Sequence, residues 1–372
     1  MAGIIDLDKP QQATSTARSE RPAMRRYVKS LLFPLAAAAL GLVFAVAIAE
    51  LTLRALSLAP SDAISTVTES EFRRVPGIFG PGQQIVDRQL AALPFAVRID
   101  SLGFRGVDFP VRKRAGELRI LSVGDSFTYG DFVDNDSTFP AVLERDLTAS
   151  CSRPVTVINA GVGGSTITTA VHMVDRAWGL SPDVVLLTFV ENDIDDLRND
   201  MWGELAANRK AKSKFPLSVI YPALRRSALW NFSLKLRGRV RAVGFSSLPT
   251  ATADPRSRSD VPVLRAKYSH ILDSLAKSVR GRDRSFVLAA FPSHLTMSGI
   301  TTTEQLRWLE GTGKDHGVPT FNLFSPLHAS GLPTTSLYLL PYDGHPSPHG
   351  YEIAGAWLAS QLASMGLCRT PE

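Results

Sequence analysis

The sequence has few of the features that mark metal-binding and nucleic-acid-binding proteins. Its 372 residues include only two cysteines, and they form no Cys/His spacing typical of a zinc site. A Walker phosphate-binding loop and RNA-binding signatures are also missing. The formal net charge of +6 is small for this length, so charge alone does not indicate nucleic-acid binding. We therefore expect no metal, no cofactor and no nucleic-acid partner.

The two cysteines, Cys151 and Cys368, leave two interpretations open. They are ordinary free thiols, or they form one disulfide in an oxidising compartment. Such a disulfide would close a long loop and contribute roughly 5 kcal/mol at most to stability. The sequence does not show whether the two residues approach each other.

Charged residues are absent from Leu31 to Ala49. A helix of this length would span about 28 Å, close to the roughly 30 Å hydrocarbon core of a bilayer. Pro34 falls in its first turn, where proline is tolerated. A basic cluster precedes the run: Arg25, Arg26 and Lys29. The sequence predicts a transmembrane anchor over residues 30–56 with the N-terminus in the cytoplasm, after a disordered cytoplasmic tail over residues 1–29.

A cleaved signal peptide is the alternative to this anchor. Ala47-Ile48-Ala49 resembles a small-residue cleavage site, but Leu51, Leu53 and Leu56 continue the helical pattern beyond it. We therefore favour an uncleaved anchor. A buried helix of a soluble domain fits the alanine-rich composition and the basic flank poorly. Both export interpretations place the chain after Ala49 outside the cytoplasmic membrane, in a periplasm or an equivalent extracellular space.

From Leu118 onward, short apolar runs alternate with amphipathic stretches. The predicted strands are Leu118–Val123, Val155–Ala160, Val184–Val190, Ser285–Phe291 and Val318–Asn322. The predicted helices are Phe139–Thr148, Thr166–Trp178, Pro262–Arg280, Thr302–His316 and His349–Met365. This alternation predicts an α/β fold, a flavodoxin-like three-layer sandwich with a parallel sheet of about five strands. Ligands of such sheets bind beyond the carboxyl ends of the strands.

The α/β domain is expected over residues 117–372, after a linker and lead-in over residues 57–116. Residues 200–260 interrupt the alternation and are interpreted as an insertion. Between residues 201 and 250 the chain carries ten Lys/Arg and a single acid, Glu204. Two interpretations stay open: a solvated basic face over a small satellite core, or a lid that contacts anionic lipid or an acidic glycan.

A serine follows the first predicted strand, in Gly124-Asp125-Ser126-Phe127-Thr128. Its hydroxyl would lie at the carboxyl edge of the sheet, and its backbone N–H could face an anion. A helix N-cap would explain an isolated serine equally well. A nucleophile needs in addition a base to take its proton and donors for the oxyanion.

Both requirements have candidates in the sequence. His345, in Asp343-Gly344-His345, lies on a loop before the last predicted helix, and Asp343 could hold the imidazole in one tautomer. The glycine-rich segment Asn159–Ser165 follows the second predicted strand, where a backbone N–H could approach a substrate closely. Asn192 follows the third strand, and its amide can donate without adding charge. A tight turn and a helix N-cap are the structural alternatives for the last two.

These four segments, in this order, resemble the four blocks of the SGNH/GDSL hydrolases. Gly124-Asp125-Ser126 is similar to the first block, and the oxyanion glycine of the second block aligns best with Gly164. The third block, usually Gly-x-Asn-Asp, reads Val190-Glu191-Asn192-Asp193 and lacks the leading glycine. In the fourth block Asp343 lies two residues before His345 instead of the usual three, a spacing also seen in related exported sugar-modifying members.

The resemblance covers roughly residues 118–367 and extends to the lead-in segment Asp100–Gly106, which is similar to a segment in membrane-anchored relatives. The Gly-x-Ser-x-Gly elbow of the α/β-hydrolase fold is absent, which argues against that rival fold. The resemblance therefore implies a membrane-anchored, extracytoplasmic member of the SGNH/GDSL family.

What the resemblance implies is a serine esterase that hydrolyses an O-acyl ester, acetyl or short-chain, outside the cytoplasmic membrane. Ser126, His345 and Asp343 would form its catalytic triad. The N–H groups of Ser126 and Gly164 and the amide of Asn192 would form its oxyanion hole. One alternative is an O-acetyltransferase acting on a cell-surface glycan, with a sugar hydroxyl in place of water. A second is a binding or assembly protein on an inactive scaffold, against which the intact Ser126, Asn192 and His345 argue.

Overall fold

The computed structural model describes residues 21–56, 58–59, 64–87, 94–234, 236 and 260–369, with side chains from residue 32 onward. The chain divides into two compact units, Met1–Thr52 and Leu53–Glu372. Parts of the expected tail (residues 1–20) and of the expected insertion (residues 237–259) lie outside the described residues.

The first unit consists of most of helix α1 (Arg21–Ala55), which includes Pro34. Its stretch Leu32–Ala55 has a mean hydropathy of 2.5, and the most apolar part of this stretch is not buried inside the protein. This one N-terminal apolar helix is long and apolar enough to cross a membrane.

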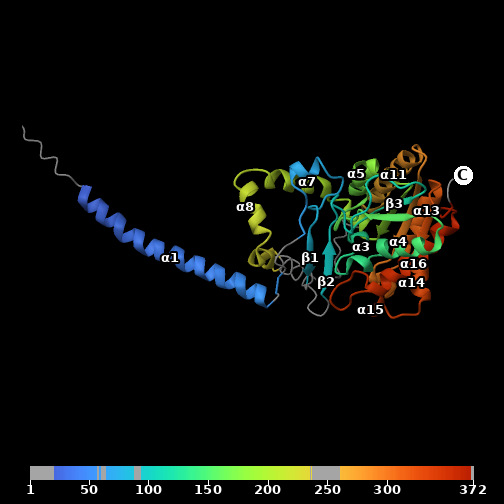
Figure 1. The fold of residues 1–372 in the computed structure, drawn as a ribbon. Coiled ribbons are helices and arrows are strands. Elements are labelled where there is room, and N and C mark those ends of the chain that lie inside the picture. The colour runs from blue at the N-terminus through green and yellow to red at the C-terminus, as the bar shows by residue number, and fades with distance from the viewer. Residues whose placement is uncertain are drawn as a thin grey trace, which may run out of the picture. The chain divides into compact units, whose positions relative to one another are not determined.

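The second unit is built around a five-stranded parallel sheet with the strand order β4-β3-β5-β6-β7 (Figure 1). The strands are β3 (Leu118–Val123), β4 (Val155–Asn159), β5 (Val184–Val190), β6 (Ser285–Phe291) and β7 (Thr320–Asn322). Every residue of β3 and β5 is buried, which explains why both strands are mostly apolar in sequence. The α/β fold with a sheet of about five parallel strands, predicted from sequence, is confirmed.

Helices cover both faces of this sheet (Figure 1). Helices α5 (Ile167–Ala177), α11 (Val261–Arg280) and α13 (Glu304–Asp315) bury their apolar sides in one core. Helices α4 (Phe139–Ser150), α14 (Phe324–Ala329) and α16 (Pro348–Ser364) pack into the core on the other face. The strand order changes direction at β3, which lies between β4 and β5. Such a switch point opens a crevice at the carboxyl ends of the strands.

The lead-in before β3 is folded and belongs to the second unit. It contains the short helix α2 (Glu69–Phe72) and an antiparallel hairpin of β1 (Gln84–Asp87) and β2 (Phe95–Arg98). Phe95 and Val97 form a small apolar cluster with Tyr129 of the main domain. In sequence, residues 57–116 have mixed polarity and several turn signals, which predict a linker and lead-in and give no clear signal for the short hairpin strands.

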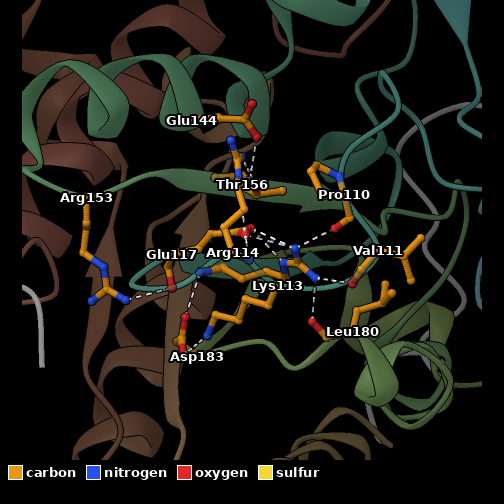
Figure 2. A network of polar contacts seen from close by, with 12 residues as sticks. Pro110, Val111, Lys113, Arg114, Glu117, Glu144, Arg153, Thr156, Leu180 and Asp183 are labelled. Atoms are coloured by element: carbon orange, nitrogen blue, oxygen red, sulfur yellow. Dashed lines mark hydrogen bonds and ion pairs between the residues drawn. The ribbon is translucent and has the colours of Figure 1, made fainter.

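A buried ion pair joins this lead-in to the start of β3, as Figure 2 shows around Glu117. The Arg119 and Glu117 side chains are fully buried, and their charged groups lie 2.9 Å apart. The Arg119 guanidinium also donates to three carbonyls at 2.8–3.0 Å, those of Pro110, Val111 and Leu180. Because a buried charge needs a partner and hydrogen bonds, this network holds the lead-in against the sheet.

The described part of the expected insertion is helical. Helix α7 (Met201–Lys212) buries Leu205 and Arg209, whereas no residue of helix α8 (Leu217–Leu224) is buried. Several apolar side chains between residues 215 and 220 are exposed: Phe215, Leu217, Val219 and Ile220.

Candidate active site

Ser126 is the first residue of helix α3 (Ser126–Tyr129), directly after β3. Asp125 is the N-cap of this helix, and its Oδ1 accepts the backbone N–H of Phe127 at 2.8 Å. Because Asp125 caps the helix, the hydroxyl of Ser126 is free for another role. The serine therefore lies at the switch point of the sheet, where ligands of such sheets bind.

The hydroxyl of Ser126 faces an imidazole. Its Oγ lies 2.8 Å from Nε2 of His345. Nδ1 of His345 is hydrogen-bonded to Oδ1 of Asp343, and the same oxygen accepts the backbone N–H of His345 at 2.8 Å. With Nδ1 protonated toward Asp343, Nε2 is left to accept a proton from Ser126. The structure thus joins the three predicted triad residues in one hydrogen-bonded chain.

Charges around His345 favour its protonated form. Burial lowers the pKa of His345, but the hydrogen bond that Nδ1 donates to Asp343 and the negative charges of Asp131 and Asp343 together outweigh burial and raise the pKa above 6.5. For Asp343, burial raises the pKa, but the side-chain and backbone hydrogen bonds from His345 and the charge of His345 together lower it by more. Asp343 is therefore an anion at neutral pH and can stabilise an imidazolium.

The imidazole is also held by its neighbours. The rings of Phe127 and Phe132 lie 5.3 and 5.5 Å from the His345 ring. Between Asp343 and His345, a Cβ at Gly344 would lie 2.5 Å from the ring of His294. Only glycine fits there, which gives the close Asp-Gly-His spacing a steric reason.

The glycine-rich loop after β4 is tied to the nucleophile turn. The N–H of Val162 and the hydroxyl of Ser165 donate to the carbonyl of Gly124 at 2.9 and 3.0 Å. Gly164 has a positive φ of +71°, which favours glycine. A Cβ on Gly164 would lie 3.0 Å from the terminal methyl of Met201, the first residue of α7.

Asn192, after β5, immediately precedes helix α6 (Asp193–Asp196). Its amide donates to Asp196 at 2.8 Å. Burial raises the pKa of Asp125 to about 6, against the opposing effect of hydrogen bonds from the backbone of Phe127 and the side chain of Asn192. An amide has two N–H donors, and Asp196 accepts one of them.

The next residue along the chain, Asp193, is buried. Burial, and then the charge of Asp125, raise its pKa well above the ordinary value. Its carboxyl therefore favours the protonated form more than an exposed aspartate does.

Asp131, Phe132 and Arg105 are not among the site residues predicted from the sequence. Asp131 lies with Oδ2 3.9 Å from Nε2 of His345. Phe132 has a left-handed backbone, with a φ of 64°. Arg105, from the lead-in, is buried and donates to the carbonyls of Tyr129, Gly130 and Val133. An isolated acid in a loop and an arginine 26 positions away from it form no recognisable spacing.

Cys151 and Cys368 are joined in a disulfide, with their Cα atoms 4.6 Å apart. Cys151 ends α4, and Cys368 follows α16. In the part of the chain that the structure describes, no group of three or more His, Cys, Asp or Glu side chains is arranged to hold a metal ion.

Residues 122–353 match the GDSL-like lipase/acylhydrolase family, so the chain belongs to this family. The resemblance to SGNH/GDSL hydrolases is thereby confirmed. Members of this family are typically serine esterases. A comparison with curated proteins gave no match.

Three solved structures illustrate the likeness in fold. A lipase/acylhydrolase from Enterococcus faecalis is 17% identical, with a TM-score of 0.41 and coverage of 67% of this chain and 96% of that one. A lipolytic G-D-S-L family protein from Veillonella parvula is 12% identical, with a TM-score of 0.39 and coverage of 66% and 98%. An acetylxylan esterase from Geobacillus stearothermophilus is 14% identical, with a TM-score of 0.38 and coverage of 70% and 100%.

Proposed function

We propose that this protein is a serine esterase that hydrolyses a short-chain O-acyl ester through Ser126, His345 and Asp343. The observation that carries the proposal is the chain of hydrogen bonds from the Ser126 hydroxyl to Nε2 of His345, and from Nδ1 to Asp343. Nucleophile, base and orienting acid are the three groups that acyl transfer through a serine requires.

In this mechanism His345 takes the proton of Ser126 as Oγ attacks the ester carbonyl. The imidazolium then gives this proton to the leaving alcohol, and an acyl-serine remains. A water molecule loses a proton to His345, attacks the acyl-serine and releases the carboxylic acid. Asp343 stays ionised throughout and stabilises the imidazolium.

The tetrahedral intermediate needs donors for its oxyanion. We assign this role to the N–H groups of Ser126 and Gly164 and to the amide of Asn192. Three adjacent strands, β4, β3 and β5, end just before these residues, and parallel strands bring their carboxyl ends to one edge. Loss of one such donor typically costs about 2.7–4 kcal/mol in the transition state.

The acyl group is proposed to be short. The methyl group of Met201 already lies against Gly164, at 3.0 Å from where a Cβ would be. Because this side chain occupies space beside the assigned oxyanion donor, an acetyl group fits more readily than a long acyl chain.

We further propose that the catalytic domain works outside the cytoplasmic membrane. Helix α1 supplies a long apolar stretch, Leu32–Ala55, and the basic residues before it favour a cytoplasmic N-terminus. The disulfide between Cys151 and Cys368 suits an oxidising compartment. We interpret α1 as an uncleaved anchor. An N-terminal sequence of the mature protein that begins after Ala49 would instead identify a signal peptide.

The proposal is tested with the full chain in detergent on p-nitrophenyl esters of increasing acyl length. We expect turnover of the acetate, a decline with longer chains, and loss of turnover in Ser126→Ala. Equal or better turnover of the octanoate would contradict the short acyl site. If wild-type protein hydrolyses none of these esters but moves acetyl groups to a sugar, the transferase alternative replaces the esterase.

A further inference from the structure

A second carboxylate lies at the reaction centre and has no part in the triad. Oδ2 of Asp131 is 3.9 Å from Nε2 of His345, on the ring nitrogen opposite the one that binds Asp343. A Cβ on Gly163 would come within 3.7 Å of the same oxygen. Asp131 therefore lies between the catalytic imidazole and the glycine-rich loop.

The Asp131 carboxylate is open to a ligand. A third of its side chain is exposed, and among the described residues no protein group donates a hydrogen bond to it. Burial of the remainder raises its pKa, which the charges of His345 and Arg105 partly oppose. An acceptor without a donor at a reaction centre is suited to receive one from the substrate.

The loop that carries Asp131 is held from the lead-in. The guanidinium of Arg105 donates to the carbonyls of Tyr129 at 3.0 Å, of Gly130, and of Val133 at 2.5 Å, on both sides of Asp131. It also stacks over the Tyr129 ring at 4.7 Å. This gives the lead-in segment Asp100–Gly106 a role: its arginine positions the loop and with it the carboxylate.

The position of Asp131 determines which part of a bound ester it can contact. Nε2 of His345 delivers the proton to the leaving alcohol oxygen, so a carboxylate 3.9 Å from Nε2 is within reach of groups attached to that alcohol. In a partly acylated sugar, the carbon next to the ester carries a free hydroxyl, which can donate to a carboxylate there. A simple alkyl ester offers no donor, and an anionic group would be repelled.

We propose that Asp131 is a specificity-determining residue that accepts a hydrogen bond from a free hydroxyl adjacent to the ester. The substrate class is then a partly acylated polyol or sugar. This inference rests on the proposed esterase function of the same site.

The test uses the full chain and two matched substrates. One is a methyl glycoside monoacetate with a free hydroxyl next to the ester, and the other is the same compound with that hydroxyl methylated. Both are measured at a pH on the alkaline plateau of the wild-type profile, so that titration of His345 does not enter. Because a hydrogen bond to a charged acceptor is involved, we expect wild type to prefer the free-hydroxyl substrate by about 10- to 100-fold in kcat/KM.

Asp131→Ala is expected to remove this preference, so that the two glycosides are hydrolysed with the same kcat/KM, because the carboxylate that accepts the hydroxyl proton is gone. Asp136→Ala, an exposed acid a few residues along the same loop, is the control and keeps the preference. Arg105→Lys should reduce the preference, because a lysine cannot bridge several carbonyls as a guanidinium does.

Different results would contradict the role of Asp131 and the proposed esterase function. If wild type shows no preference, or Asp131→Ala keeps the wild-type ratio between the two glycosides, the inference is wrong. If p-nitrophenyl acetate turnover is absent or survives in Ser126→Ala, the proposed function itself fails.

Discussion

The Oγ of Ser126 lies 2.8 Å from Nε2 of His345, although 219 positions separate the two residues in the chain. Ser126 follows the central strand β3, and His345 lies on the loop before α16. Helix α16 packs beside α4 on one face of the sheet. The packing of this last helix therefore places the base at the switch point where the nucleophile stands.

Asp343→Asn should lower kcat by about 10³- to 10⁴-fold with little change in KM, because an amide can hold the imidazole in the wrong tautomer. Steady-state kinetics on p-nitrophenyl acetate measure this loss. Asp136→Asn is the matched control and keeps wild-type kcat. An unchanged kcat in Asp343→Asn would mean that another group orients His345.

The pH profile of kcat/KM should report His345. Only the neutral imidazole can take the proton of Ser126, so activity falls as pH decreases through the pKa of His345. Burial lowers this pKa, but Asp343 and Asp131 raise it above 6.5. We therefore expect the midpoint of the acidic limb above 6.5, and a shift to lower pH in Asp131→Asn because a negative charge is removed. A midpoint below 6.5 in wild type would contradict this electrostatic picture.

Arg119→Met should cost about 3–5 kcal/mol of unfolding free energy, because it leaves the Glu117 carboxylate buried without its partner. Urea unfolding measures the loss, and adding Glu117→Met should restore part of it. Arg145→Met is the control: Arg145 pairs with Glu352 on the surface, with about half of each side chain exposed, and such pairs contribute about 0–1 kcal/mol. Equal effects of the two arginine substitutions would show that burial of the Arg119 pair is unimportant.

Replacing both Cys151 and Cys368 by alanine should lower the unfolding free energy by up to about 5 kcal/mol, since the disulfide closes a loop across most of the domain. Reduction of the wild-type protein should have a similar effect and should leave the double variant unchanged. Two titratable thiols in denatured, unreduced wild-type protein would show that the bond does not form.

The sheet could be predicted because its strands are buried on both faces. Leu118–Val123 and Val184–Val190 are short, mostly apolar runs, and the structure has strands with these bounds. The last strand, Thr320–Asn322, is shorter than the expected Val318–Asn322. It lies at the edge of the sheet, where fewer partners define where pairing begins.

The triad residues could be named because each follows a strand or precedes a helix in an ordered set of motifs. Asp131 could not, because its importance comes from the turn that brings it back toward His345. That turn depends on Arg105, whose donors are paired with backbone carbonyls. Because every residue has a backbone carbonyl, contacts to carbonyls cannot be recognised from the types of the residues contacted.

The central claim, that Ser126 is the nucleophile and His345 its base, is tested most directly by a fluorophosphonate probe on the full chain. Peptide mass analysis should locate the adduct on Ser126 in wild type. Ser126→Ala should not be labelled, and His345→Ala should be labelled far more slowly, while Ser165→Ala, a serine of the glycine-rich loop, should still be labelled on Ser126. Labelling of Ser126→Ala at the wild-type rate, or an adduct on another residue of the wild-type protein, would contradict the account.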